Sequence, residues 1–297
     1  MPILEEITEA AGRVLAAAGP SVVRVGRDDG RGAGIVVAEG SVVTSAHNLR
    51  GPQITVTFSD GEVVTGEVRG VDADGDVAVV AAATGSRRPI EWSAGAGPAV
   101  GAPVFALGLP AGGGSARVTF GTVSATDRSF RGPRGRLIVD SVEHTAPVGR
   151  GSSGGPLVDG EGRLLAVNTH RLGDGLYLAL PATPELRSRV DALSRGEAPA
   201  RRRLGVALAP PHVARRLRAA VGLAPREGVL VREVDEDGPG AAAGLKRGDL
   251  IVDADGRAIS SIDDLLGALD AAGSGGSLAL KVVRGDAEVD VTVRFGA

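Results

Sequence analysis

The chain has 297 residues, a length that predicts two or three domains. Its formal net charge of −3 gives no reason to expect a nucleic-acid ligand, and the absence of cysteine excludes disulfides and thiolate metal sites. Aromatic residues make up only 2%, so the cores must be built from Val, Leu, Ile and Ala. The 46 glycines and 17 prolines favour short strands joined by many turns.

Residues 1–20 are predicted to form an amphipathic helix. Apolar side chains recur at helical spacing and glutamates fall on the other side, as shown by Ile3, Leu4, Ile7, Ala11, Val14 and Leu15 against Glu5, Glu6 and Glu9. The start of the chain lacks the basic and apolar segments of a secretory signal, and no apolar run is long enough to span a bilayer. As encoded, we therefore expect a cytoplasmic protein without a membrane segment.

The next region, residues 21–187, changes to short β-rich runs cut by glycine. Many short strands at this spacing predict antiparallel sandwiches or barrels. The expected strands are 21–25, 34–37, 41–44, 53–58, 62–68, 77–82, 104–107, 118–125, 137–141 and 164–168.

An arginine-rich stretch with little periodicity, residues 188–201, is predicted to be a linker. A small α/β module over 202–297 follows it. Its expected strands are 228–234, 250–254, 278–284 and 288–294. Its expected helix carries Leu265 and Leu269 on one face and begins at a capping-box pattern formed by Ser261 and Asp264.

Three local motifs that suit acyl transfer occur in the order His, Asp, Ser. His47 ends the motif Thr-Ser-Ala-His after an expected strand, and Ser153 stands in the glycine-rich segment 151–157. Asp76 is chosen over its neighbours Asp72 and Asp74 because a Val/Ala strand follows it immediately. In such a triad the serine attacks, the histidine moves the proton and the buried aspartate fixes the imidazole tautomer. Taken alone, Ser153 would be read as an ordinary loop serine.

These motifs resemble the HtrA (Deg) family of chymotrypsin-like serine proteases. The similarity lies in the segments Gly-Ser-Ser-Gly-Gly-Pro-Leu at 151–157, Ser-Ala-His-Asn at 45–48, Gly-Ala-Gly-Ile-Val at 32–36, Gly-Leu-Pro at 108–110, Thr-Phe-Gly-Thr-Val-Ser at 119–124 and Leu-Ala-Leu-Pro at 178–181. The resemblance implies a mainly β fold with two antiparallel β-barrels. It also implies an oxyanion hole made by the backbone N–H groups of Gly151 and Ser153, and chemistry that needs no metal or cofactor.

The last region resembles a PDZ domain, the module that follows the protease in this family. Leu204-Gly205-Val206 matches the carboxylate-binding loop, and residues 238–249 match the Pro-Ala…Ala-Gly-Leu…Gly-Asp signature, with Gly240 in place of the usual alanine. The resemblance implies that a C-terminal peptide adds as a strand beside residues 204–207. Its last side chain would then lie near Leu265 and Leu269.

Substrate preference follows from the position six residues before the nucleophile. Trypsin-like relatives that select Lys or Arg have an acid there, whereas this chain has Pro147. Val148 and Val167 are expected to help close the primary pocket, so we expect cleavage after small or medium aliphatic residues.

Three departures from the family pattern bear on activation. Ser152 replaces the usual Asn, and His144 and Thr145 replace the usual Thr and Asp of a neighbouring segment. We expect a low-activity resting state in which the nucleophile loop is badly placed and a substrate or PDZ ligand shifts it.

The function expected from the sequence is a serine endopeptidase for unfolded or misfolded proteins, with a PDZ domain that captures hydrophobic chain ends or regulates activity. The alternative is a catalytically silent chaperone-like or binding protein with the same fold. Family members form trimers through N-terminal aromatic contacts and usually act in the cell envelope. Residues 1–20 contain no aromatic side chain, so the sequence does not predict that mode of trimerisation.

Overall fold

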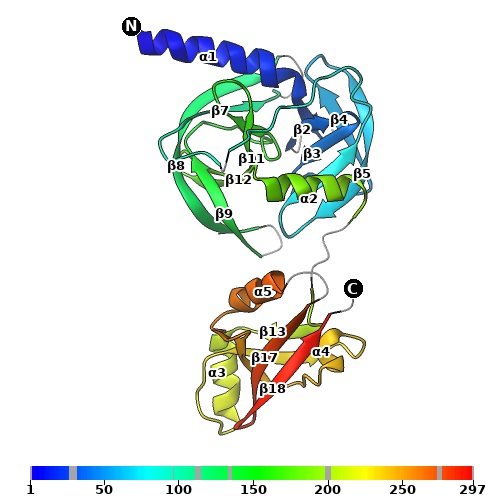
Figure 1. Ribbon diagram of the computed structural model, residues 1–297, viewed down its shortest axis with the longest axis vertical. Coiled ribbons are helices and arrows are strands. Elements are labelled where there is room, and N and C mark those ends of the chain that lie inside the picture. Colours follow the sequence, from blue (N-terminus) through cyan, green and yellow to red (C-terminus); the bar gives the residue numbers. More distant parts are fainter. Residues whose placement is uncertain are drawn as a thin grey trace. The chain divides into compact units, whose positions relative to one another are not determined.

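The computed structural model describes residues 2–26, 32–95, 97–110, 115–132, 136–197, 202–272 and 276–295. The chain divides into two compact units, Met1–Pro199 and Ala200–Ala297 (Figure 1). Among the described residues, no helix is both long enough and apolar enough to cross a membrane.

The predicted N-terminal helix is present as α1 (Pro2–Ala18) and is followed by the 3₁₀ turn η1 (Gly19–Ser21). Val14 and Ala18 are fully buried and belong to the largest core of the first unit, whereas Ile3 and Leu4 are exposed. The C-terminal half of α1 is therefore anchored on the protein by its apolar stripe.

The first barrel closes in the order β1-β2-β3-β6-β5-β4, and each paired neighbour is antiparallel. Its interior holds Val and Ile side chains together with Phe58, as the alternating sequence requires. The 3₁₀ turn η2 (Ala46–Asn48) follows the third strand. The strands are β1 (Val22–Val25), β2 (Gly32–Ala38), β3 (Ser41–Thr44), β4 (Gln53–Phe58), β5 (Val63–Asp72) and β6 (Val77–Ala81).

The second barrel closes in the order β10-β11-β12-β9-β8-β7, so the expected architecture of two antiparallel β-barrels is confirmed. The strand periodicity did not reveal β10, because it has only three residues. The strands are β7 (Pro103–Gly108), β8 (Arg117–Arg131), β9 (Leu137–His144), β10 (Pro156–Val158), β11 (Leu164–Gly173) and β12 (Leu176–Pro181).

The two barrels share one buried core along their common face, which we call the seam. Ile35, Val43 and Val79 from the first barrel and Leu107 and Leu178 from the second belong to a single cluster, each 1% exposed or less. This continuous apolar contact fixes the position of one barrel against the other.

Helix α2 (Pro184–Ser194) corrects the predicted linker, because residues 188–194 are part of a packed helix. Thr183 caps it by accepting a hydrogen bond from the Leu186 N–H, and Leu186, Val190 and Leu193 are buried against the first unit. The helix packs on β5 and β6 (Figure 1). Arginines separate its apolar residues, so the amino-acid composition of this stretch is polar and did not indicate a packed helix.

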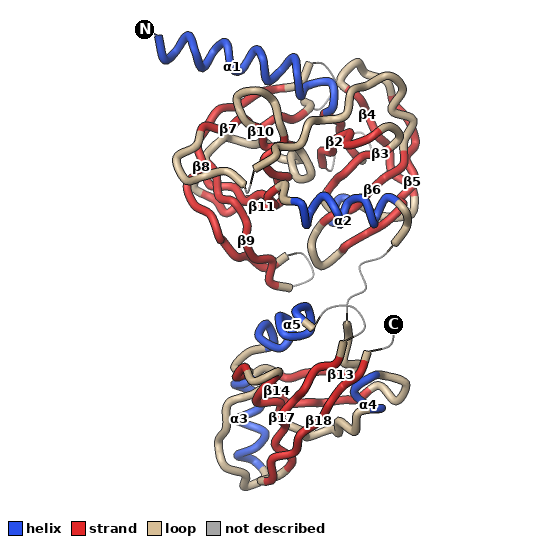
Figure 2. Tube along the Cα trace, in the orientation of Figure 1, coloured by secondary structure: helices blue, strands red, loops and turns tan. Residues whose placement is uncertain are grey.

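The second unit is a mixed α/β module, as expected, with an antiparallel sheet in the order β13-β14-β15-β17-β18 and β16 paired to β15 (Figure 2). The helices α3 and α4 were not anticipated from the pattern. The elements are β13 (Val206–Ala209), α3 (Pro211–Ala220), β14 (Val229–Val234), α4 (Pro239–Ala242), β15 (Leu250–Ala254), β16 (Arg257–Ala258), α5 (Ile262–Ala271), β17 (Ser277–Arg284) and β18 (Ala287–Arg294).

The expected cap of α5 is present in altered form. Ser261 Oγ accepts a hydrogen bond from the Asp264 N–H, which is one half of a capping box. The other half is shifted by one residue, since Asp264 accepts from the N–H and hydroxyl of Ser260. The hydrogen bonds from Ser260 lower the pKa of Asp264.

Candidate active site

The structure brings His47 and Asp76 together at the seam. His47 Nδ1 lies 2.9 Å from each carboxylate oxygen of Asp76, and the His47 backbone N–H donates to Asp76 Oδ1 at 3.1 Å. Asp76 is 1% exposed, whereas the His47 side chain is 32% exposed. A proton on Nδ1 satisfies the carboxylate and leaves Nε2 free to accept another proton, which is the form that a general base needs.

The structure also separates the roles of the three neighbouring aspartates. Asp76 has a left-handed backbone (φ 55°) directly before β6, and its side chain turns to His47. Asp72 accepts from the Gly75 N–H and lies 3.3 Å from Arg189 of α2, and Asp74 lies 3.9 Å from Arg136. Of the three, Asp76 is the one in position to orient the imidazole.

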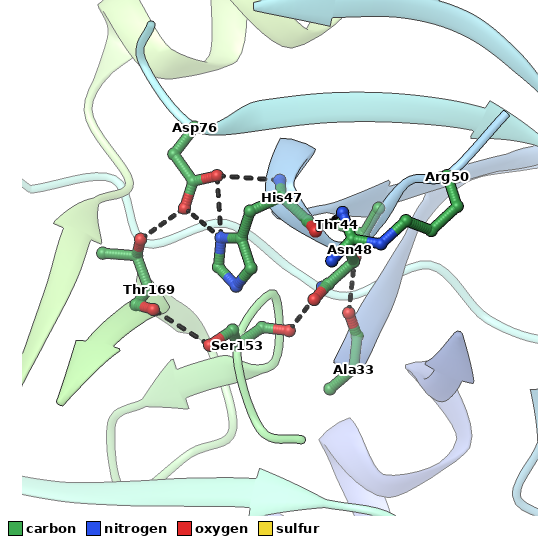
Figure 3. Close-up of polar contacts among 8 residues, drawn as sticks. All are labelled: Ala33, Thr44, His47, Asn48, Arg50, Asp76, Ser153 and Thr169. Atoms are coloured by element: carbon green, nitrogen blue, oxygen red, sulfur yellow. Dashed lines mark hydrogen bonds and ion pairs between the residues drawn. The ribbon is translucent and has the colours of Figure 1, made fainter. Parts of the chain in front are cut away.

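Ser153 lies on the other side of the imidazole ring, so that His47 stands between it and Asp76 (Figure 3). Its Oγ donates a hydrogen bond to the backbone carbonyl of Thr169 at 2.9 Å. Within the described part of the chain, no hydrogen bond joins this hydroxyl to His47. Rotation about the Cα–Cβ bond of Ser153 would redirect the hydroxyl, so this is a resting arrangement of the pair.

The backbone carbonyl of Ser153 is fastened to the first barrel. It accepts hydrogen bonds from the Ala33 N–H and from Asn48 Nδ2, both at 2.9 Å. The next residue, Gly154, has φ +90°, and a Cβ there would lie 2.3 Å from the Ala33 carbonyl oxygen. Glycine after the nucleophile is therefore required both by backbone conformation and by close packing.

The two N–H groups predicted for the oxyanion hole belong to Gly151 and Ser153. The Gly155 N–H donates to the Ser152 carbonyl at 2.9 Å, and because the peptide is planar the N–H of Ser153 points the opposite way. Among the described residues, no group accepts a hydrogen bond from the N–H of Gly151 or Ser153. Neither donor is therefore occupied by another group of the described residues, as a role in an oxyanion hole requires.

Thr169 was missed by the sequence analysis and connects the other residues of the site. Its hydroxyl donates to Asp76 Oδ2 at 2.6 Å, and its carbonyl holds the Ser153 hydroxyl. It lies in β11 immediately after the expected strand 164–168. Its place after an expected strand is the only indication that the sequence offers for Thr169. It does not predict the contact with Asp76, which lies 93 positions away.

The predicted pocket residues separate into two groups. Pro147 and Val148 line a cavity of about 600 Å³ that also reaches Ser152, next to the nucleophile. Val167 does not line this cavity. It is 2% exposed and lies in the seam core, because it pairs with Pro156 and Leu180 inside the sheet.

His144 forms a buried polar network below the nucleophile loop (residues 147–155). It is fully buried, stacks on Tyr177, and its Nε2 lies 2.8 Å from Asn168 Oδ1. Asn168 in turn donates from its side chain and its backbone to the Gly155 carbonyl, and it accepts from the Gly154 N–H. Burial lowers the pKa of His144, and the hydrogen bond to Asn168 opposes that effect.

The predicted peptide-binding residues of the second unit lie close to its core. Leu204 is 3% exposed, Leu265 0% and Leu269 4%, and all three belong to one apolar cluster against which Val206 is partly buried. Gly205 has φ +67°, which favours glycine. Among the described strands, β13 pairs with β14 alone, so its other edge is open.

Each of the two units matches a known protein family. Residues 32–167 match the trypsin-like peptidase domain, and residues 203–295 match the PDZ domain. The chain is 31% identical over 285 residues to the putative serine protease HhoB of Synechocystis, covering 91% of this chain and 67% of that protein. The chain belongs to the HtrA family of serine proteases.

Other HtrA-type proteins show the same similarity. A probable periplasmic DegP-like serine endoprotease of Halomonas elongata is 31% identical over 89% of this chain and 56% of its own length. Protease Do-like 1, chloroplastic, of Arabidopsis thaliana is 32% identical over 89% and 63%. The solved structure of the HtrA-type protease AlgW with a decapeptide matches with a TM-score of 0.75 and 25% identity, covering 96% of this chain and 98% of that one. The chain thus spans between about half and two thirds of the curated relatives.

Thr169→Val should reduce turnover while leaving the fold intact. A hydrogen bond to a carboxylate contributes about 1.5–3 kcal/mol, so its loss should lower kcat/KM roughly 10- to 100-fold. Thr169→Ser, which keeps the hydroxyl, is the matched control and should retain most activity. Equal kcat/KM for the Val and Ser variants would show that the contact with Asp76 does not orient the site.

The stability of the protein should depend on pH through His144. Above its ordinary pKa of 6.5 the group is neutral whether folded or unfolded. As the pH falls below that value, the unfolded chain binds the proton first, and the free energy of unfolding should decline by at most about 1.4 kcal/mol per pH unit until the lowered folded pKa is passed.

Thermal unfolding of wild type and His144→Gln between pH 7.5 and 5 measures this contribution. The variant should lose part of the pH dependence. Parallel curves for wild type and His144→Gln would contradict the assignment.

Proposed function

We propose that this protein is a serine endopeptidase that cleaves polypeptide substrates through His47, Asp76 and Ser153. The observation that carries the proposal is the buried carboxylate of Asp76 on His47 Nδ1, with Ser153 on the far side of the same ring. This arrangement supports His47 as the base and Ser153 as the nucleophile.

The reaction proceeds by acyl transfer. Ser153 Oγ attacks the substrate carbonyl carbon while His47 Nε2 takes the hydroxyl proton, and the carbonyl oxygen becomes an anion that accepts from the N–H groups of Gly151 and Ser153. His47 then gives the proton to the leaving amine as the peptide bond breaks. Water, deprotonated by His47, then attacks the acyl carbon, and His47 returns this proton to Ser153 Oγ as the acyl bond breaks and the second product leaves.

The first step requires the Ser153 hydroxyl to leave the Thr169 carbonyl and turn to His47. The present arrangement supports a resting state in which the Ser153 side chain is turned away from His47. A substrate that binds the active rotamer of Ser153 more tightly than the resting one would shift the population toward the active rotamer.

For substrates, we propose unfolded or misfolded proteins cut after small or medium aliphatic residues. Pro147 supports this preference because it places no acid six residues before Ser153, where relatives that select Lys or Arg carry one. The alternative, a silent chaperone-like protein, predicts binding of unfolded chains without covalent reaction at Ser153.

The PDZ domain is proposed to bind hydrophobic C-terminal peptides next to β13. The open edge of this strand supports strand addition, and the glycine loop before it supports capture of a carboxylate by backbone N–H groups. Because Leu265 and Leu269 are buried, the ligand would contact only their outer surface, beside the partly buried Val206 and Leu266.

Ser153→Ala should abolish both casein cleavage and labelling by a fluorophosphonate probe, because it removes the attacking oxygen. Substitution of the exposed Ser194 by Ala is the control and should leave both unchanged. Cleavage that persists in Ser153→Ala would overturn the proposed nucleophile. A wild-type protein that neither reacts with the probe nor cleaves casein, yet keeps casein from aggregating, would favour the alternative.

A fluorescent peptide ending in a free hydrophobic residue should bind the full-length Ser153→Ala protein more tightly than the same peptide with an amidated end. Hydrogen bonds to a charged acceptor contribute about 1.5–3 kcal/mol, so amidation should weaken the Kd roughly tenfold or more. Fluorescence anisotropy measures both. Equal affinities would rule out capture of the carboxylate.

A further inference from the structure

The cavity beside the nucleophile loop has an apolar floor and a basic rim. Its lining comes from β7, β8, the nucleophile loop, β11 and β12, all within the first unit. The floor includes Leu107 and Tyr177, which are 1% and 4% exposed. Because Ser152 lines the cavity and precedes the nucleophile, an occupant of this space lies within a few residues of the bond to be cleaved.

Three arginines stand around this floor and are exposed: Arg117 from β8, Arg150 from the nucleophile loop and Arg171 from β11. The lining contains no aspartate or glutamate, and no described carboxylate forms an ion pair with any of the three. The guanidinium carbon of Arg171 lies 5.5 Å from the centre of the Tyr177 ring, so this cation is held over the floor.

The arrangement selects for negative charge. Three like charges around one concave surface repel each other, and low-dielectric walls concentrate their field inside the cavity. A carboxylate would relieve the repulsion, and guanidinium groups bind carboxylates through two parallel hydrogen bonds. Other arginines of the same unit already have such partners, as Arg163 has in Asp159 at 2.8 Å.

We propose that this cavity is a subsite for an acidic side chain of the substrate, glutamate or aspartate, close to the cleaved bond. The inference rests on the proposed function and makes it more specific. The methylene groups of glutamate would pack on Leu107 and Tyr177 while its carboxylate reaches the arginine rim. An unfolded segment that combines an aliphatic residue with a nearby acid would then be cut in preference to a purely aliphatic one.

Peptides with one fixed valine cleavage site test the proposal. Glutamate, glutamine or lysine is placed in turn at each of the three positions before this valine and at each of the two positions after the bond. At one position or more, glutamate should raise kcat/KM at least about tenfold over glutamine and further over lysine, and salt should reduce this ratio. Arg117→Gln combined with Arg171→Gln should bring the glutamate-to-glutamine ratio to about one. The control Arg163→Gln should keep it.

Two results would overturn the subsite: no position that prefers glutamate, or a preference that survives the double substitution. Because each comparison is a ratio within one variant, a general loss of activity does not imitate the expected result. Binding of the same peptides to Ser153→Ala, followed by anisotropy, tests the acidic preference without turnover. A protein that binds glutamate peptides selectively but never reacts with fluorophosphonate would refute the proposed function and leave the subsite standing.

Discussion

The backbone carbonyl of Ser153 is the point on which the geometry of the site depends. It belongs to a loop of the second barrel, yet both of its hydrogen bonds come from the first barrel, from the Ala33 N–H and the Asn48 side chain. These bonds fix the position of Ser153 relative to His47, which directly precedes Asn48 in the sequence. The missing side chain of Gly154 allows the approach, since any Cβ would collide with the first barrel.

The acid of the site is stabilised by the same junction. A carboxylate as buried as Asp76 needs several donors to offset its lost hydration. It has the backbone N–H and the Nδ1 of His47 from its own barrel and the hydroxyl of Thr169 from the other. The apolar seam beneath these contacts resists relative movement of the barrels. The hydrogen bonds that orient Asp76 and the apolar core of the seam therefore both hold the two barrels together at the site.

Local patterns in the sequence predicted short strands and selected His47, Asp76 and Ser153 as candidates, whereas the two barrels and the PDZ domain were expected from the resemblance to the HtrA family. The roles of Thr169 and Asn48 were out of reach, since they rest on contacts across 93 and 105 positions. Helix α2 was not predicted, because arginines lie between its apolar residues. Val167 was expected to help close the pocket, but the register of its strand buries its side chain. The rotamer of Ser153 is likewise a property of the assembled seam.

Because the site is divided between two barrels, its two halves are synthesised one after the other. A ribosome completes the first barrel, with its histidine and aspartate, before the loop of Ser153 and the strand of Thr169 have emerged, and domains tend to fold as they appear. At that stage the chain has the proposed base and acid but not the proposed nucleophile. On the proposed function, the capacity to cut polypeptides would therefore arise only when β11 has been made and packed in place, so an unfinished chain could not attack itself or its neighbours.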